Sequence, residues 1–220
     1  MPPRMPGVAY LFKKYSRMIK KIAIAIAVIG IIFYSLNDTK LDISTYAAQL
    51  NKARKAKNQS FRQGENSPLV TAEKASFDSL KYYPASLEFV INATVARNET
   101  PDTVTMQMSD NRTEKYLNWG KANFSIDKAA QQLTLYLKAT GTDSTLFIPF
   151  TDLTNGRETY GGGRYLDAPI PKLNVGELKL DFNAAYNPFC AYNNEYSCPV
   201  PPTDNRLKIG IPAGEKSYRE

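Results

Sequence analysis

The chain has 220 residues, enough for one globular domain with a sizeable core and a short additional segment. Lys and Arg total 28 against 21 Asp and Glu, but six cations precede Ile22, where no acid occurs, and removing them leaves 22 against 21. The remainder is therefore nearly neutral, which gives no support for nucleic-acid binding, and the absence of histidine excludes Ser-His-Asp triads, Cys-His dyads and histidine zinc sites.

An apolar run, "IAIAIAVIGIIFYSL" from Ile22 to Leu36, follows the cationic residues 1–21. As a helix it would span roughly 22 Å, less than the roughly 30 Å of a bilayer core, although Lys20 and Lys21 can snorkel. The end of this run and the residues that follow it, "FYSLNDTK", lack the alternating small side chains of a signal-peptidase site. We therefore expect an uncleaved transmembrane signal-anchor at 22–36, rather than a cleaved signal peptide or a buried helix. The cationic tail should be cytoplasmic and the C-terminal domain periplasmic or extracellular.

Residues 37–66 are mostly polar, with Tyr46, Leu50 and Ala53 near one helical stripe. This pattern predicts a helical stalk or linker. It would connect the anchor to a domain that occupies residues 67–220.

Apolar and polar residues alternate in several short segments of 67–220, a period typical of half-buried β-strands. Turn sequences such as "ATGTD", "LTNGRE" and "IPAGE" separate these segments. The pattern predicts a mainly β domain, either an antiparallel β-sandwich or a small barrel. The alternating apolar residues are Leu87, Phe89, Ile91, Ala93 and Val95; Val104, Met106 and Met108; Leu133, Leu135 and Leu137; Leu146, Ile148 and Phe150; Leu178, Leu180 and Phe182; and Leu207, Ile209 and Ile211.

The segment "ETYGGGRYLD" places three consecutive glycines between two tyrosines, and two interpretations of it stay open. In the first, the glycine backbone is a cradle, with the arginine as a fixed cation and the tyrosines as walls for a carboxylate, phosphate or sugar. In the second, it is a hairpin in which the arginine pairs with one of the two acids. Neither phosphate-binding fingerprint fits, since no Lys-Ser/Thr follows and no helical pattern begins here. The residues concerned are Glu158, Tyr160, Gly161, Gly162, Gly163, Arg164, Tyr165 and Asp167.

Glu158 and Asp167 also form a candidate carboxylate pair for glycoside hydrolysis, which needs two acids about 5 to 9 Å apart. A hairpin permits that separation but does not select it. Two acids in a surface turn are more commonly just solvated.

Cys190 and Cys198 are the only cysteines. In an oxidising exterior we expect a disulfide, worth about 2.5 kcal/mol by loop-entropy reasoning, with structural or functional free thiols as alternatives. A metal site would need two further ligands, and seven intervening residues do not match a zinc-knuckle spacing. We expect neither a metal nor another cofactor.

The cysteines lie in "NPFCAYNNEYSCPVPPTDNRL", whose prolines exclude a regular strand or helix. This loop is either a rigid lid that binds polar ligands or a cover over one end of the barrel. In the second case the amides of Asn187 and Asn205 would bond loose backbone groups.

Two long blocks, "LFIPFTDLTNGRETYGGGRYLD" and "LDFNAAYNPFCAYNNEYSCPVPPTDNRLKIGIPAGEK", resemble the domain of unknown function 1684 family, which shows a similar order of blocks. The resemblance covers roughly residues 41–216. It implies no biochemical role, because none comes with the family.

Three hypotheses on function remain. The first is a membrane-anchored extracytoplasmic domain that binds a small molecule or a protein partner. The second is a membrane-tethered hydrolase that uses Glu158 or Asp167 as acid or base, with Arg164 stabilising an anion. The third is a structural envelope protein. Besides the glycine segment, the binding hypothesis includes Asn183, Tyr186, Asn187 and Arg206.

Overall fold

The computed structural model describes residues 42–139, 145–171 and 176–219. The predicted cytoplasmic tail and the signal-anchor at 22–36 therefore lie outside the described residues. Within these ranges, no helix combines the length and apolar character that a membrane span needs.

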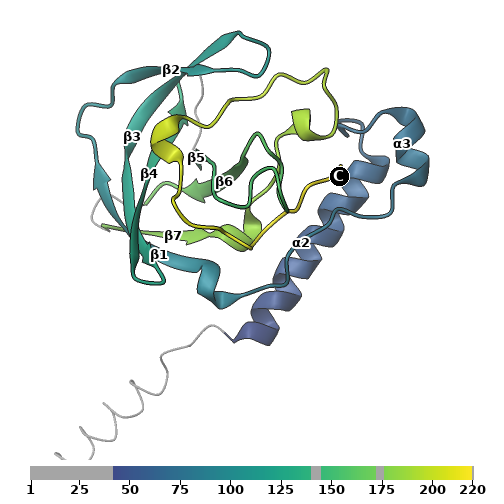
Figure 1. Ribbon diagram of the computed structural model, residues 1–220, viewed down its shortest axis with the longest axis horizontal. Helices are drawn as coiled ribbons and strands as arrows, with labels where there is room; N and C mark the ends of the chain where they lie inside the picture. The colour runs from purple at the N-terminus through teal and green to yellow at the C-terminus, as the bar shows by residue number, and fades with distance from the viewer. Residues whose placement is uncertain (1–41, 140–144, 172–175, 220) are drawn as a thin grey trace, which may run out of the picture. The chain divides into compact units, whose positions relative to one another are not determined.

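The strands of the described ranges form one antiparallel sheet, in the order β6-β5-β4-β3-β1-β7, with β2 paired to β3 (Figure 1). The sheet curls until its edges approach. Tyr165 at the start of β6 exchanges backbone hydrogen bonds of 2.9 and 3.0 Å with Tyr186, which follows β7. The predicted mainly β, antiparallel fold is confirmed, and it is a nearly closed barrel. The strands are β1 (Val90–Arg97), β2 (Thr103–Gln107), β3 (Thr113–Ile126), β4 (Ala129–Lys138), β5 (Thr145–Phe150), β6 (Arg164–Pro169) and β7 (Glu177–Asp181).

The apolar faces of β1, β4, β5 and β7 point into the barrel and contribute to the main core, whereas Met106 of β2 packs in a separate cluster with Tyr116 and Tyr136. Leu133 and Leu135 from β4 meet Ile148 from β5 in this interior, and all three are fully buried. Burial of such side chains is the main favourable term in folding. The period of two in the sequence therefore identified the inward faces of these strands.

Two segments differ from the sequence prediction. The longest strand, β3, was not predicted, because the register shift between Asn118 and Gly120 interrupts its alternation. A strand was predicted at 207–211, but this segment has no regular strand. Leu207 and Ile211 fill the core, while the backbone of 205–209 bonds to the loop that follows β5.

The helix predicted in residues 37–66 exists, as α2 (Ile43–Gln63), but it packs on the domain instead of forming a free stalk. It runs along one side of the barrel, close to the C-terminal segment (Figure 1). Tyr46 donates to both carboxylate oxygens of Asp181 at 2.8 Å, and Phe61 is buried against Phe77 and Tyr192. These contacts arise because Tyr46 and Phe61 present apolar surface that a solvated stalk would leave in water. The short helices are α3 (Thr71–Ser76), η1 (Leu87–Phe89), η2 (Phe182–Ala184), η3 (Phe189–Ala191) and η4 (Thr203–Asn205).

Candidate functional site

The glycine segment lies in the long hairpin loop between β5 and β6, residues 151–163. The two strands pair from Thr145 with Pro169 to Phe150 with Arg164, so the segment is part of a hairpin, although the ion pair that the second interpretation expected for Arg164 does not form. Gly163 has φ +91°, and a Cβ there would lie 2.7 Å from the carbonyl oxygen of Phe150. This position requires glycine on both counts. A Cβ at Gly162 would lie 2.5 Å from the Tyr160 ring, so Gly162 leaves space for that ring to fold back.

Arg164 is fully buried and forms an ion pair with Asp152, with 2.9 Å between Nη2 and Oδ2. Its guanidinium also donates to the carbonyls of Ile211, at 2.9 Å, Ala213 and Glu215. The ion-pair partner of Arg164 is therefore Asp152, whose carboxylate is buried with it, and not Glu158 or Asp167. Arg164 joins β6 to the C-terminal segment and offers no surface to a ligand.

Asp152 is equally enclosed. Its second oxygen accepts from the backbone N–H and the hydroxyl of Thr154, at 2.8 and 2.6 Å, and from the Ile211 N–H at 3.1 Å. A buried ion pair is stable only where the remaining donors and acceptors of both side chains are also paired. Nearly all the donors and acceptors of Arg164 and Asp152 have such partners.

The outer side of the same loop lines a hollow of about 620 Å³. Two chain connections build it. The N–H of Lys216 donates to the Lys81 carbonyl at 2.9 Å, and the N–H of Ser217 donates to the Glu158 carbonyl at 3.0 Å. Because of these bonds, the segments before β1 and after Ile211 lie beside the loop. We call this hollow the basic pocket; it is lined by Lys81, Gly156, Arg157, Glu158, Thr159, Gly161, Lys216, Ser217 and Arg219.

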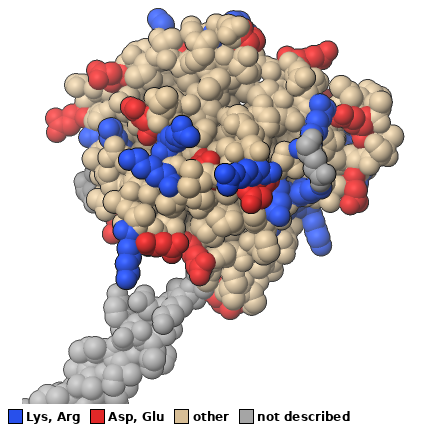
Figure 2. Space-filling model, viewed as in Figure 1, with Lys and Arg blue, Asp and Glu red and all other residues tan. Residues whose placement is uncertain are grey.

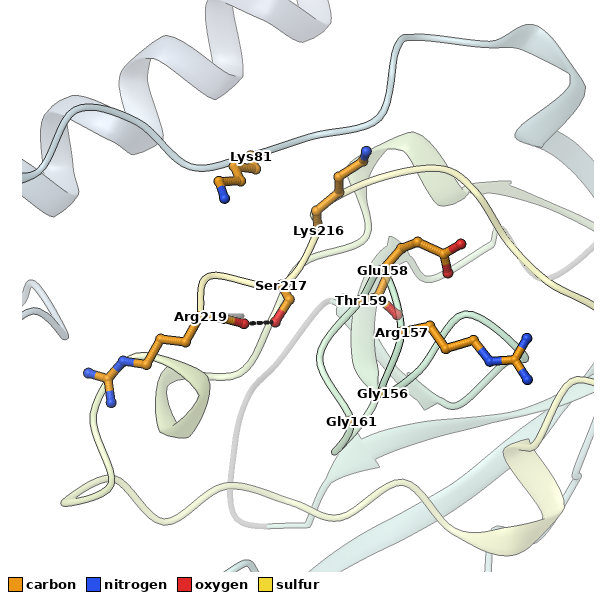
Figure 3. A pocket seen from close by; sticks show the side chains of 9 residues that line it. All are labelled: Lys81, Gly156, Arg157, Glu158, Thr159, Gly161, Lys216, Ser217 and Arg219. Carbon is orange, nitrogen blue, oxygen red and sulfur yellow. Dashed lines mark hydrogen bonds between the residues drawn. The ribbon is translucent and has the colours of Figure 1, made fainter.

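Four cations and one acid line the basic pocket (Figure 3). The side chains of Arg157 and Arg219 point to opposite sides of it, and Lys216 lies near Glu158 in this view. Arg219 is held by Glu73 at 3.0 Å, and the Lys216 ammonium lies 4.5 Å from the centre of the Tyr83 ring. Elsewhere, Figure 2 shows Lys and Arg interspersed with Asp and Glu over one face of the domain.

The two acids of the proposed catalytic pair line different hollows. Glu158 belongs to the basic pocket, whereas Asp167 lines a hollow of about 330 Å³ together with Tyr116, Lys138, Thr145 and Phe147. The Tyr186 hydroxyl donates to Asp167 at 2.9 Å. Partial burial raises the pKa of Asp167, although the hydrogen bond from Tyr186 acts in the opposite direction. The structure thus does not bring Glu158, Asp167 and Arg164 to one place.

The other predicted site residues are mostly structural. Asn183 bonds both backbone groups of Ser86, at 2.9 and 2.8 Å, and Asn187 donates to the Lys216 carbonyl at 2.8 Å. The Tyr165 hydroxyl donates to the Pro199 carbonyl. Arg206 is exposed and lies outside the basic pocket. Of the predicted residues, only Glu158 and Gly161 line that pocket.

Asn205 has the backbone role that the cover interpretation gave it. Its amide donates to the carbonyls of Thr134 and Pro149 at 2.9 and 2.8 Å, and its oxygen accepts from the Thr134 N–H at 2.7 Å. Because Pro149 has no N–H, β5 cannot complete its ladder with β4 at this point. The asparagine side chain replaces the missing backbone bonds.

A second buried carboxylate, Glu215, ties α2 to the domain. It accepts from the ammonium of Lys57 at 2.9 Å, from the Asn187 N–H at 3.0 Å and from the Tyr192 hydroxyl. Glu215 is 1% exposed, whereas the Lys57 side chain is 28% exposed. Burial and the neighbouring Glu215 raise the pKa of Tyr192 well above its ordinary value.

The disulfide prediction differs from the structure, in which Cys190 and Cys198 are free thiols. They remain neighbours, since the N–H of Cys190 donates to the Cys198 sulfur at 3.1 Å. The Cys198 sulfur accepts this backbone hydrogen bond and has no covalent bond to Cys190. Among the described residues, no group of three or more Cys, Asp or Glu side chains could hold a metal ion.

Sequence reasoning missed most of the basic pocket, including the residues Lys81, Arg157, Lys216, Ser217 and Arg219. Arg157 directly precedes the glycine segment, and its position in a turn signal is the one hint in the sequence. The rest come from distant segments, and no local pattern brings them together.

Comparison with known proteins connects this architecture to a family. A family model described as "Protein of unknown function (DUF1684)" matches residues 75–216. The solution NMR structure of an uncharacterized protein from Haloarcula marismortui is similar, with a TM-score of 0.64 and 38% identity, over 80% of this chain and 97% of that one. Comparison with curated proteins gave no match. The match of the family model over residues 75–216 shows that the chain, with its barrel and its glycine loop, belongs to the DUF1684 family.

Proposed function

We propose that the domain binds a small anionic ligand, a phosphate or a carboxylate, in the basic pocket. The observation that carries the proposal is that four cations and one acid line a single hollow of a domain that is otherwise nearly balanced in charge. The Arg157 side chain is long and exposed, so it can swing to meet an anion at little cost. A pocket of this size admits a ligand of several non-hydrogen atoms.

Backbone groups support the same proposal. Gly161 lines the pocket, and its N–H has no hydrogen-bond partner among the described residues. An exposed N–H at a turn can donate to an anion, as in other concave anion sites. The pocket thus offers both charge and a directional donor.

The test is calorimetric titration of the full-length protein with inorganic phosphate at low and high salt. Combined Arg157→Ala and Lys216→Ala substitutions should weaken binding about tenfold, since each exposed charge contact is worth up to about 1 kcal/mol. Affinity should also fall as salt screens the cations.

Matched controls come from exposed cations outside the pocket, Arg206→Ala and Lys179→Ala. Both should bind phosphate as the wild-type protein does. Equal binding by the pocket variants and the wild type, or equal weakening by the controls, contradicts the proposal.

We propose further that residues 22–36 anchor the chain in a membrane, with the domain on the outer side. The uncharged run and the six preceding cations support this orientation. Protease added to intact cells should digest the domain while a cytoplasmic control protein stays intact. Protection of both proteins contradicts the orientation.

A further inference from the structure

The two cysteines form a contacting pair in the loop between η2 and η4. Besides the bond from the Cys190 N–H to the Cys198 sulfur, the Cys198 N–H donates to the Ser109 hydroxyl at 3.0 Å. The backbone around both residues is therefore held in place, with the Cys198 sulfur 3.1 Å from the Cys190 nitrogen. Little movement would bring the two sulfur atoms to bonding distance.

The pair is connected to the basic pocket through Tyr160. Its hydroxyl lies 3.9 Å from the Cys190 sulfur, within hydrogen-bonding distance for this element. Tyr160 stands between Thr159 and Gly161, which both line the pocket. Gly162 permits this arrangement, because any side chain there would collide with the Tyr160 ring.

The two thiols are unequal. Cys198 is 7% exposed, whereas Cys190 is only partly buried. Hydrogen bonds from the Cys198 thiol and the Tyr160 hydroxyl lower the pKa of Cys190 to about 7, although burial acts against them. The same pairing and burial raise the pKa of Cys198. The accessible thiol is therefore also the one that more readily forms the reactive thiolate.

We propose that Cys190 and Cys198 are a redox-active dithiol in which Cys190 reacts first, and that Tyr160 transmits its oxidation state to the basic pocket. The second part rests on the proposed anion binding, whereas the first does not. The oxidant we assign is a low-molecular-weight disulfide.

The reaction is two successive thiol–disulfide exchanges. The Cys190 thiolate attacks one sulfur of the small disulfide, forms a mixed disulfide and releases one small thiolate. Cys198 then gives up its proton and attacks the Cys190 sulfur, which releases the second small thiolate. In total, the protein loses two hydrogens as the internal disulfide forms, and the small disulfide is reduced to two thiols.

Oxidation changes what Tyr160 contacts. A sulfur in a disulfide carries neither a proton nor a negative charge, so its hydrogen bond with the Tyr160 hydroxyl is lost or much weakened. The ring then holds the glycine turn less firmly, and Gly161 with it. We expect the oxidised protein to bind inorganic phosphate about fivefold more weakly, the equivalent of one hydrogen bond.

The thiol reaction is tested with oxidised glutathione and non-reducing mass analysis of the full-length protein. The wild-type protein should lose two hydrogens and resist alkylation. Cys198→Ser should trap one glutathione on Cys190, and Cys190→Ser should react much more slowly. The proposal is overturned if both thiols stay alkylatable or if Cys198 reacts first. A disulfide between two chains would also overturn it.

The connection to the pocket is tested by phosphate titration of reduced and oxidised protein. Tyr160→Phe keeps the ring but lacks the hydroxyl, so its affinity should not depend on oxidation. If reduced wild-type protein binds phosphate and oxidation leaves its affinity unchanged, the connection is overturned. If reduced protein does not bind phosphate at all, the pocket proposal and the connection fail together, while the mass analysis still decides on the dithiol.

Discussion

Arg157, in the loop between β5 and β6, and Arg164, at the start of β6, belong to one hairpin and carry the same side chain, but they differ completely in environment. Arg164 is 0% exposed and gives its donors to Asp152 and to three backbone carbonyls. Arg157 is exposed and lines a pocket that is rich in cations. The comparison teaches that the conspicuous arginine of the glycine segment supports the fold, and that its less conspicuous neighbour is the candidate for binding.

The two sides of the loop depend on each other. Arg164 binds the carbonyls of 211–215, and this segment continues directly into Lys216 and Ser217, which line the pocket. The buried pair thus positions part of the exposed site. Single substitutions, each compared with a matched control, can separate the role in folding from the role in binding.

The largest effect is expected from Arg164→Met, which leaves Asp152 as an unpaired buried charge. It should lower the free energy of unfolding by about 3–5 kcal/mol. Arg157→Met, at an exposed position, should change it by less than about 0.5 kcal/mol. Urea denaturation of both variants measures the contrast, and equal losses would break the comparison.

A smaller effect is expected from Asn205→Ala, which removes three bonds to the backbone of β4 and β5. It should cost about 2–3 kcal/mol, because buried backbone groups lose their partners. The control is Asn123→Ala, an exposed asparagine of β3. Hydrogen exchange should quicken at Thr134 only in the first variant; unchanged protection of its amide would refute the role of Asn205.

A still smaller effect separates the glycines. Gly163→Ala forces a side chain into a left-handed conformation at an occupied place and should cost at least about 1–2 kcal/mol. Gly161→Ala would place its Cβ 3.7 Å from the Cα of Gly156, an ordinary van der Waals contact, and should be neutral within about 0.5 kcal/mol. Thermal unfolding of the two variants gives the difference. A stable Gly163→Ala protein would show that the turn is not constrained as described.

The sequence was informative where one face of a strand is buried along its whole length. Leu146, Ile148 and Phe150 were identified as core residues because the alternation of apolar and polar side chains along a strand can be recognised without knowledge of distant residues. The pattern failed at β3, where Trp119 and Gly120 accompany a register shift. It also failed at 207–211, whose apolar residues fill the barrel although its backbone is not part of a regular strand.

The site was harder to predict for a different reason. Arg164 follows three glycines and precedes a tyrosine, a local context that is equally compatible with exposure and burial. Its partner Asp152 and the carbonyls of 211–215 are brought to it only by the folded chain. Lys81 and Lys216 lie far apart in the sequence, and a backbone bond between them cannot be inferred from composition.

The most direct test of the central claim is an NMR titration of the full-length protein with inorganic phosphate, with every backbone amide observed. The proposed anion site predicts shift changes confined to Lys81 and the segments 156–161 and 216–219, lost in the combined Arg157→Ala and Lys216→Ala variant and retained in Arg206→Ala. Shift changes scattered over the barrel, or unchanged in the pocket variant, would contradict an anion site on the outer side of this loop.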